Sequence, residues 1–416
     1  MKTFAVRMYG EGDLRLESFE LPSISDNEIL ARVVTDSVCM SSYKAVVQGK
    51  KHKRVPNNID TNPVIIGHEF CGEILEVGKK WQGKYQEGER FIIQPALCYN
   101  GSLDAPGYSY EFIGGDSQFV VIPDEVMETD NLIPYNSECF FKGSLAEPIS
   151  CIIGAFNASY HTEKGSYIHK MGVKSGGKML ILAGCGPMGI GAIDYALNAL
   201  SIPPELLVVT DTDNERLSRA KALFQKENVV FTNATTKEEL FNISGNTGYD
   251  DVFVFAPVET LVELGDSLLC EDGCLNFFAG PTKTDFSAKL NFYNVHYGQT
   301  HIVGTSGGNR DDMKMASVLM EKNIINPSVM ISHIGGIDAV VDTTMKLPFI
   351  DGAKKLIYTG ISLPLTKIAN FEQLSKTDNE NAQLFKELAI ICEKYDGIWN
   401  EEAEKFLLNN AKKLEA

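Results

Sequence analysis

Long apolar runs and positive charge are both scarce in this sequence of 416 residues. No segment reaches the roughly 18 consecutive apolar residues of a membrane-spanning helix, and the N-terminal residues alternate apolar and charged positions instead of forming a signal peptide. Lys and Arg total 38 against 55 Asp and Glu, a net charge of −17, and such a surface repels nucleic acids and anionic membranes. We therefore expect a soluble, cytoplasmic protein with neither of these as a partner.

Cysteine is present without the regular, dense spacing of a disulfide framework, because the nine residues are scattered along the chain. This distribution is typical of a reducing compartment. The chain also shows no internal repeat and no low-complexity linker. Its length exceeds what one hydrophobic core usually supports, so we expect at least two domains.

The patterning of the chain changes near residue 151. Before it, short β-type runs are separated by Gly, Pro, Asp and Asn, which predicts a barrel-like β domain. After it, apolar strands alternate with helical segments, which predicts a parallel sheet with crossover helices. Residues 311–360 return to mixed strand and helix and can rejoin the first domain. Apolar residues at helical spacing predict two amphipathic helices over 381–395 and 400–416.

A glycine motif follows the apolar run KMLIL and opens a helical segment. Gly184, Gly186 and Gly189 have the GxGxxG spacing, with Pro187 and Met188 between them. In this context the glycines allow a tight turn and let backbone amides approach a pyrophosphate at the helix N-terminus. The sequence therefore predicts a dinucleotide site, the alternative being that these glycines only build a strand-to-helix turn.

The next apolar strand, LLVVT, is followed by Asp211 at the position of the acidic residue that binds the ribose. Its carboxylate accepts hydrogen bonds from both ribose hydroxyls of NAD and repels the 2′-phosphate of NADP. We therefore predict NAD as the cofactor. The nearby Arg216 leaves NADP open by offering a partner to a 2′-phosphate, although it is equally consistent with a solvated helix residue.

Three candidate zinc ligands lie in the first domain: Cys39 in TDSVCMSSYK, and His68 and Glu69 in PVIIGHEFCGEI. A catalytic zinc takes about three such protein ligands and leaves a position for substrate. Taken singly, each is more often a core residue or a hydrogen-bonding residue than a ligand. Spacing alone does not decide between these interpretations.

Four motifs occur together in one order: VCxSS, GHEFCGEIxEVG, the AEP of Ala146 to Pro148, and the glycine motif. In this the chain resembles the zinc-dependent medium-chain dehydrogenases over roughly residues 1 to 360, and within them the sorbitol dehydrogenase branch and its enzymes that reduce L-sorbose 1-phosphate. The resemblance implies an α/β protein: a GroES-like β-barrel catalytic domain over 1–153 and 310–365, and a Rossmann NAD-binding domain with a doubly wound parallel sheet over 154–309. We expect residues 366–416 to form a helical C-terminal extension.

The same resemblance implies a catalytic zinc bound by Cys39, His68 and Glu69, with Glu147 as a fourth ligand or one reached through water. Which glutamate binds directly stays open. The region 94–115 lacks the four closely spaced cysteines that hold a structural zinc in the family, since only Cys98 is there. We therefore predict one zinc per chain. A homodimer or homotetramer is the usual assembly of such enzymes.

The resemblance also implies a proton relay, in which Ser41 supplies a hydroxyl beside the zinc-bound oxygen. Lys44 follows at a position where many members have a histidine. An ammonium whose pKa is lowered by burial and a nearby cation can pass the proton to solvent. The alternative is that Lys44 is a solvated surface residue.

A basic run lies just after the candidate ligand Cys39, in an otherwise acidic chain. It is a candidate phosphate site and comprises Lys50, Lys51, Lys53 and Arg54, with His52 between them. Arg310, with Asn309 before it, is a second candidate, and Gly307 and Gly308 can bring amides toward an anion. The basic run is equally consistent with a solvated loop, and the alternative for the segment 307–310 is a turn before a helix.

These residues, with the resemblance, predict a small sugar or sugar-phosphate substrate, best described by the pair L-sorbose 1-phosphate and D-glucitol 6-phosphate. One alternative is a dehydrogenase of unphosphorylated polyols. A second is a zinc-free quinone or enone reductase, which lacks the pair Cys39 and His68. A third is a nucleotide-binding protein without catalysis, because a fold does not fix a function.

Overall fold

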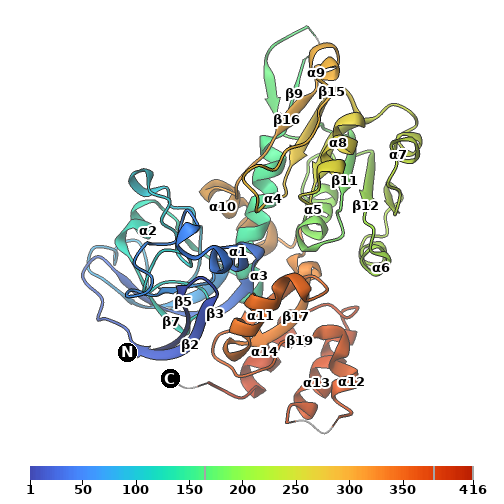
Figure 1. Ribbon diagram of the computed structural model, residues 1–416. Coiled ribbons are helices and arrows are strands. Elements are labelled where there is room, and N and C mark those ends of the chain that lie inside the picture. The colour runs from blue at the N-terminus through green and yellow to red at the C-terminus, as the bar shows by residue number, and fades with distance from the viewer. Residues whose placement is uncertain (164, 378–379, 415–416) are drawn as a thin grey trace. The chain divides into compact units, whose positions relative to one another are not determined.

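The computed structural model describes residues 1–163, 165–377 and 380–414 (Figure 1). Contacts divide the chain into two compact units, Met1–Glu147 with Ile331–Ala416, and Pro148–Met330. The predicted domain boundaries are 153/154 and 309/310, whereas contacts group residues 310–330 with the second unit and residues 366–416 with the first. We keep the domain assignment as a proposal.

The first unit is built on an eight-stranded sheet in which β3 is central. Its strand order is β19-β17-β18-β3-β5-β6-β8, with β7 also paired to β3, and a second sheet has the order β2-β1-β4. The strands are β1 Lys2–Gly10, β2 Asp13–Glu20, β3 Ile29–Val38, β4 Val64–Ile65, β5 Phe70–Val77, β6 Arg90–Ile93, β7 Phe119–Ile122, β8 Leu132–Pro134, β17 Ile331–Gly336, β18 Lys354–Tyr358 and β19 Thr366–Lys367. These strands follow the short apolar runs of the sequence, as the pattern predicts.

Short helices connect these strands, and two longer helices end the chain. They are α1 Met40–Gln48, α2 Asp124–Glu128, α3 Phe141–Ser144, α11 Val340–Lys346, α12 Phe371–Leu374, α13 Ala382–Glu393 and α14 Glu401–Asn410. The prediction of two C-terminal amphipathic helices is confirmed. The second ends at Asn410 and not at 416, and residues 415–416 lie outside the described part.

The C-terminal helices pack on the sheet through a shared core. Leu388 of α13 and Leu407 of α14 are fully buried in one cluster with Leu356 of β18. Trp399, which lies between the two helices, donates a hydrogen bond to the Tyr358 hydroxyl at 2.8 Å. The apolar faces of these helices therefore complete the core of the first unit.

The second unit is a parallel six-stranded sheet in the order β13-β12-β11-β14-β15-β16. Its strands are β11 Lys178–Leu182, β12 Leu206–Thr210, β13 Val229–Thr232, β14 Tyr249–Val254, β15 Leu269–Phe277 and β16 His301–Val303, and a separate hairpin pairs β9 Tyr160–Thr162 with β10 His169–Met171. The helices are α5 Pro187–Asn198, α6 Asn214–Leu223, α7 Lys237–Ile243, α8 Glu259–Ser267, α9 Phe292–Tyr297 and α10 Arg310–Glu321, and the division between the units falls after the second residue of α4 Ala146–Ala158. This order, which reverses between β11 and β14, is that of a doubly wound dinucleotide-binding sheet.

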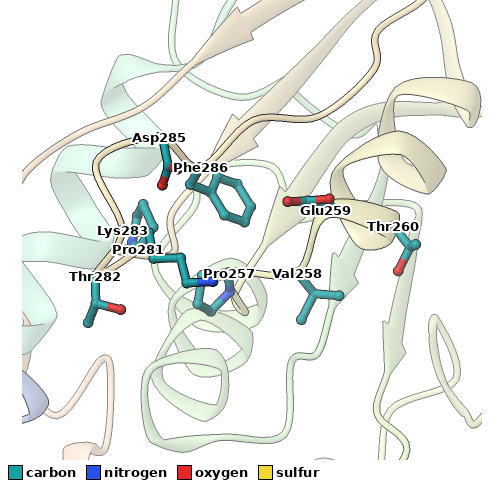
Figure 2. A pocket seen from close by; sticks show the side chains of 9 residues that line it. All are labelled: Pro257, Val258, Glu259, Thr260, Pro281, Thr282, Lys283, Asp285 and Phe286. Atoms are coloured by element: carbon teal, nitrogen blue, oxygen red, sulfur yellow. The ribbon is translucent and has the colours of Figure 1, made fainter.

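A pocket of about 530 Å³ opens beyond the carboxyl ends of β14 and β15. Segments 257–260 and 281–286 line it, and Figure 2 shows the Lys283 and Glu259 side chains at its wall. Ligands of doubly wound sheets bind outside the carboxyl ends of the strands.

Among the helices of the described residues, none combines the length and the apolar character that a membrane span requires.

Candidate metal and cofactor sites

Three neighbouring strands of the first unit bring the candidate metal site together. β3 pairs antiparallel with β5, with Asp36 opposite Phe70, so Cys39 just after β3 lies near His68 and Glu69 just before β5. β18 pairs antiparallel with the other side of β3, with Lys355 opposite Val38. The register therefore places the first residue of β18 beside the same end of β3.

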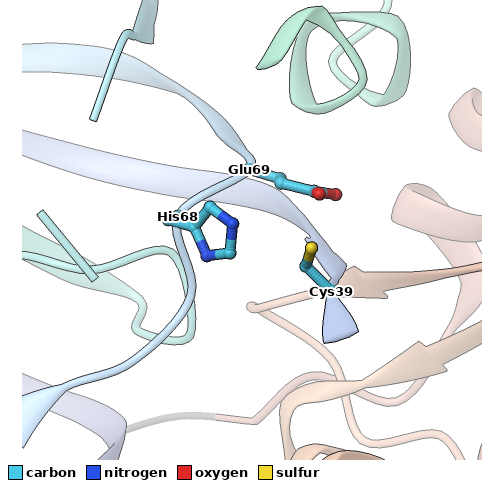
Figure 3. Close-up of side chains that lie close together, drawn as sticks. All are labelled: Cys39, His68 and Glu69. Atoms are coloured by element: carbon cyan, nitrogen blue, oxygen red, sulfur yellow. The ribbon is translucent and has the colours of Figure 1, made fainter. Parts of the chain in front are cut away.

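The three predicted ligands converge at this point (Figure 3). The Cys39 sulfur, one His68 nitrogen and one Glu69 oxygen all lie within 4.8 Å of one another. Cys39 also caps α1, because its side chain accepts a hydrogen bond from the Ser41 backbone N–H at 3.5 Å. The end of a strand and the start of a helix thus fix the thiol between them.

His68 is buried, with a hydroxyl at each ring nitrogen. The Ser42 hydroxyl lies 3.2 Å from Nδ1 and the Tyr108 hydroxyl lies 3.1 Å from Nε2. Burial lowers the pKa of His68 to about 4, so the ring is neutral at pH 7 and keeps a lone pair for a metal. Whichever nitrogen binds an ion, the other retains a hydroxyl partner that fixes the tautomer and the ring.

A buried lysine, Lys354, contacts Glu69. Its Nζ lies 2.5 Å from Oε1, and the side chains of Lys354 and Glu69 are 5% and 1% exposed. Burial by itself lowers the pKa of Lys354, but Glu69, Cys39 and Glu147 outweigh it and the pKa is raised. Lys354 is therefore charged, and it was missed by the sequence analysis, although two consecutive lysines in the apolar strand KKLIY signal buried cations.

The donor set fits a zinc ion. Burial and the neighbouring Glu69 charge raise the pKa of the Cys39 thiol to about 12, so the thiol needs a cation to become the thiolate that binds metal. Sulfur, imidazole and carboxylate are the ligands that zinc prefers. Lys354, a cation, cannot ligate and instead balances the negative charge of Glu69. Cys39, His68 and Glu69 are the residues that would hold the ion.

A second layer of carboxyl groups lies behind Glu69. Asp36 accepts the Glu69 backbone N–H at 3.2 Å, and burial raises the pKa of Asp36 well above its usual value and that of Asp116 to about 8. Gly67 has φ of 91°, and a Cβ there would lie 2.6 Å from the Asp116 backbone nitrogen. The motif GHEF thus requires this glycine for the turn that presents His68.

The other predicted site residues of the first unit lie around the cluster. Glu147, in the first turn of α4, is outside the group of mutually close ligand atoms, but its charge acts on Cys39 and Lys354. Ser41 and Lys44 are on α1, directly after Cys39. Lys44 is half-buried, and burial lowers its pKa while Cys39 raises it.

The structure separates the members of the basic run. The Lys50 ammonium lies 2.9 Å from Asp60, and the Lys51 ammonium lies 3.3 Å from Glu11, both at the surface. Lys53 is exposed. Arg54 is half-buried, with its guanidinium carbon 5.2 Å from the centre of the Tyr108 ring. Arg54 thus contacts Tyr108, a residue that touches His68.

In the second unit, the glycine motif forms the predicted strand-to-helix turn between β11 and α5. A Cβ on Gly189 would lie 2.1 Å from the Gly184 carbonyl oxygen, whereas a Cβ on Gly186 would meet no atom within 4 Å. Gly189 thus serves close packing of the turn and Gly186 leaves space above it. Pro187 and Met188 begin α5, with the proline in the first turn.

Asp211 follows β12 and accepts backbone hydrogen bonds from Cys185 at 3.1 Å and Asp213 at 3.0 Å. It therefore ties the carboxyl end of β12 to the glycine turn. Arg216 pairs with Asp213 at 3.4 Å on an exposed surface of α6. Arg310 begins α10 and lies 3.4 Å from Asp311, and the preceding Asn309 side chain caps that helix.

The chain matches the alcohol dehydrogenase GroES-like domain family over residues 25–130. It is 50% identical to the L-sorbose 1-phosphate reductase of Klebsiella pneumoniae over 99% of this chain and 98% of that protein. It is also 50% identical to the uncharacterized protein YggP of Escherichia coli, over 98% and 97% of the two chains. Identity to the mannitol-1-phosphate 5-dehydrogenase of Aliivibrio fischeri is 47%, over 98% and 97%.

Solved structures share the fold. The 2R,3R-butanediol dehydrogenase from Bacillus subtilis superposes with a TM-score of 0.70 at 20% identity, covering 86% of this chain and 99% of that one. A putative zinc-binding dehydrogenase from Sinorhizobium meliloti, bound to NADP, gives 0.71 at 19% identity, covering 86% and 100%. The predicted combination of a GroES-like domain with a Rossmann sheet is confirmed.

Proposed function

Because the chain belongs to the family of zinc-type medium-chain dehydrogenases, we propose that it interconverts a polyol phosphate and a ketose phosphate with NAD(H). It is an NAD(P)-dependent zinc dehydrogenase that acts on an alcohol or polyol. The observation that carries the proposed reaction is the convergence of Cys39, His68 and Glu69 within 4.8 Å. For the substrate we propose the pair L-sorbose 1-phosphate and D-glucitol 6-phosphate, supported by the full-length similarity to an L-sorbose 1-phosphate reductase.

A zinc ion bound at this site supplies a Lewis acid that lowers the pKa of an alcohol and polarises a carbonyl, and bound NAD(H) supplies the hydride chemistry. The neutral His68 ring offers its lone pair, and the Ser42 or Tyr108 hydroxyl at its other nitrogen holds the ring in place. Lys354 holds the Glu69 carboxylate in place and balances its negative charge within the buried site. We propose Glu147 as a more distant ligand, reached through water.

Ser41 and Lys44 are proposed to carry the proton between substrate and solvent. They stand on α1 directly after the ligand Cys39. Burial lowers the pKa of Lys44, which brings its proton affinity closer to that of a relay group at neutral pH. A Lys44→Met enzyme is expected to lose at least tenfold in kcat, with the loss shrinking as pH rises because hydroxide then replaces the relay.

For the cofactor we propose NAD over NADP. Asp211 presents a carboxylate at the end of β12, where the ribose of a dinucleotide lies in doubly wound sheets. Arg216 is engaged by Asp213, which reduces its use as a partner for a 2′-phosphate. Equal kcat/KM values for NADH and NADPH would contradict this preference.

The experiment that tests the substrate measures NADH oxidation by zinc-loaded enzyme with L-sorbose 1-phosphate and, in parallel, with L-sorbose. We expect kcat/KM to be at least tenfold higher for the phosphate, which is about 1.4 kcal/mol of transition-state binding. Equal values would leave a dehydrogenase of unphosphorylated polyols. Full activity after exhaustive chelation would instead indicate a zinc-free reductase.

Mannitol 1-phosphate with NAD is the second substrate to compare. In L-sorbose 1-phosphate the phosphate is on the carbon next to the carbonyl, whereas the name mannitol-1-phosphate 5-dehydrogenase places the reacting carbon four positions from the phosphate. The two substrates therefore require phosphate sites at different distances from the metal. A higher kcat/KM for D-glucitol 6-phosphate than for mannitol 1-phosphate, both with NAD, is the expected result.

A further inference from the structure

The basic run contains one cation that differs from its neighbours. Lys50 and Lys51 each pair with a surface carboxylate, Asp60 and Glu11. Within residues 1–163, 165–377 and 380–414, the Arg54 guanidinium makes no ion pair and no hydrogen bond, and its Nε is enclosed without a partner. Enclosing an N–H of a charged group without an acceptor is costly, so a ligand that offers an acceptor to Arg54 is stabilised there.

The Arg54 backbone is anchored by hydrogen bonds, and its side chain contacts a neighbour of the candidate metal site. Its backbone carbonyl accepts a hydrogen bond from the Ser109 hydroxyl at 2.7 Å, and that hydroxyl in turn accepts the Ala105 N–H at 2.9 Å. Its guanidinium carbon lies 5.2 Å from the centre of the Tyr108 ring. The hydroxyl of that same ring lies 3.1 Å from Nε2 of His68. One tyrosine ring thus separates the guanidinium from a candidate metal ligand.

A second basic side chain lies against the same ring. The His52 ring stacks on Tyr108 with centroids 5.7 Å apart and an angle of 11° between the planes. Burial, followed by the charges of Arg54 and Lys53, lowers the pKa of His52, so it is a neutral hydrogen-bonding group at pH 7. Arg54 is therefore the permanent cation of this corner and His52 is a polar neighbour.

We propose that Arg54 binds the phosphate group of the substrate and so determines the preference for a phosphate monoester on the carbon next to the reacting carbon. The inference rests on the proposed function and assigns its specificity to one residue of the basic run. A guanidinium presents a planar fork of donors that matches two phosphate oxygens, which a lysine ammonium does not. The Arg54 guanidinium contacts the Tyr108 ring, and the Tyr108 hydroxyl contacts the candidate ligand His68. A cation this near the candidate metal site suits a substrate whose phosphate is next to the carbonyl.

The test compares Arg54→Ala with Arg15→Ala. Arg15 is a matched control, because its guanidinium carbon also lies over a tyrosine ring, 4.2 Å from the centre of Tyr9, and it is paired with Asp13 at the surface. Arg54→Ala is expected to lower kcat/KM for L-sorbose 1-phosphate at least 100-fold and that for L-sorbose less than threefold. The control is expected to change neither value by more than twofold.

Arg54→Lys keeps the charge and removes the fork, so we expect a loss of about tenfold for the phosphate substrate. If Arg54→Ala does not fold, the Arg54→Lys variant tests the assignment of the phosphate to Arg54 by itself. Equal losses for both substrates, or an unchanged preference for the phosphate, would overturn the assignment of Arg54.

Inorganic phosphate separates this inference from the proposed function. If the wild-type enzyme treats both sugars alike, the proposed substrate fails. Equilibrium binding of phosphate to wild-type protein and tenfold weaker binding to Arg54→Ala would still support an anion site, whereas equal binding to both proteins, or none, would refute it.

Discussion

Lys354, the first residue of β18, forms a buried ion pair with Glu69, just before β5, although β18 and β5 flank β3 on opposite sides and are not paired with each other. The paired atoms lie 2.5 Å apart and 285 residues separate the partners in the sequence. Breaking a buried pair leaves one charge uncompensated, which costs more than the intact pair contributes. The pair therefore affects both the stability of the sheet and the charge of the candidate metal site.

Lys354→Met is expected to lower the unfolding free energy of the metal-free protein by about 3 kcal/mol, because Glu69 remains buried without its cation. Zinc then supplies the missing charge, so the increase in melting temperature on adding zinc becomes larger than in wild type. The control is Lys346→Met, which removes a surface pair with Asp342 and should cost less than about 1 kcal/mol. An unchanged metal-free melting temperature would contradict this account.

Metal analysis is expected to find one zinc per chain. Within the described residues, one group of three candidate ligands has its ligand atoms within 4.8 Å of one another, and it comprises Cys39, His68 and Glu69. Cys39→Ser should abolish stoichiometric zinc, whereas Cys98→Ser, at an exposed thiol, should leave it unchanged. Two zinc ions per wild-type chain, with one lost in the Cys98 variant, would show a structural site.

Two glycine variants separate folding from cofactor binding in the second unit. Gly189→Ala places a methyl group 2.1 Å from the Gly184 carbonyl oxygen and is expected to lower the melting temperature by several degrees. Gly186→Ala meets no atom within 4 Å at φ of −74° and should leave stability unchanged. It should nevertheless weaken NADH binding at least tenfold, measured by calorimetry, if the pyrophosphate lies over the turn. Unaltered binding would place the dinucleotide elsewhere.

The buried Glu404 carboxylate of α14 predicts a pH dependence of stability. It accepts the backbone N–H groups of Phe140 and Phe141 at 2.7 and 2.9 Å, yet burial raises its pKa to about 7. The folded state therefore binds a proton more tightly than the unfolded state, so the stabilisation is full below pH 4.5 and is lost as pH rises to about 7. The loss amounts to about 3 kcal/mol.

Glu404→Gln should remove this part of the pH profile, measured as melting temperature between pH 5 and pH 8. Glu402→Gln, at an exposed residue of the same helix paired with Lys394, is the control and should keep the wild-type slope. Identical slopes for all three proteins would show that Glu404 does not contribute to the pH dependence in this range.

The sequence was sufficient to predict many of the strands and helices, and its resemblance to a family through ordered motifs predicted the cluster of Cys39, His68 and Glu69. Short apolar runs located strands such as β3 and β11, and helical spacing located α13 and α14. The proximity of Cys39 to His68 follows from the register of β3 on β5, which the sequence does not encode locally.

The surroundings of the cluster could not be predicted in the same way. Tyr108 reaches His68 from a loop 40 residues away, and Lys354 arrives from 285 residues away, with no periodic pattern connecting them. In the basic run, composition showed the positive charge but not which side chains are paired with carboxylates. Lys51, for example, pairs with Glu11, which lies in a turn 40 residues earlier in the sequence. Such pairings depend on tertiary contacts alone.

The order in which the chain is synthesised gives the ion pair of Lys354 with Glu69 a further consequence. The three candidate zinc ligands leave the ribosome early, and the whole second unit is made before β18 appears. During that interval the Glu69 carboxylate lacks the Lys354 ammonium that balances its charge in the folded protein. The first unit becomes complete only when the last helices cover β18, and a ribosome-bound or truncated chain therefore holds the donors of the enzyme without its finished core.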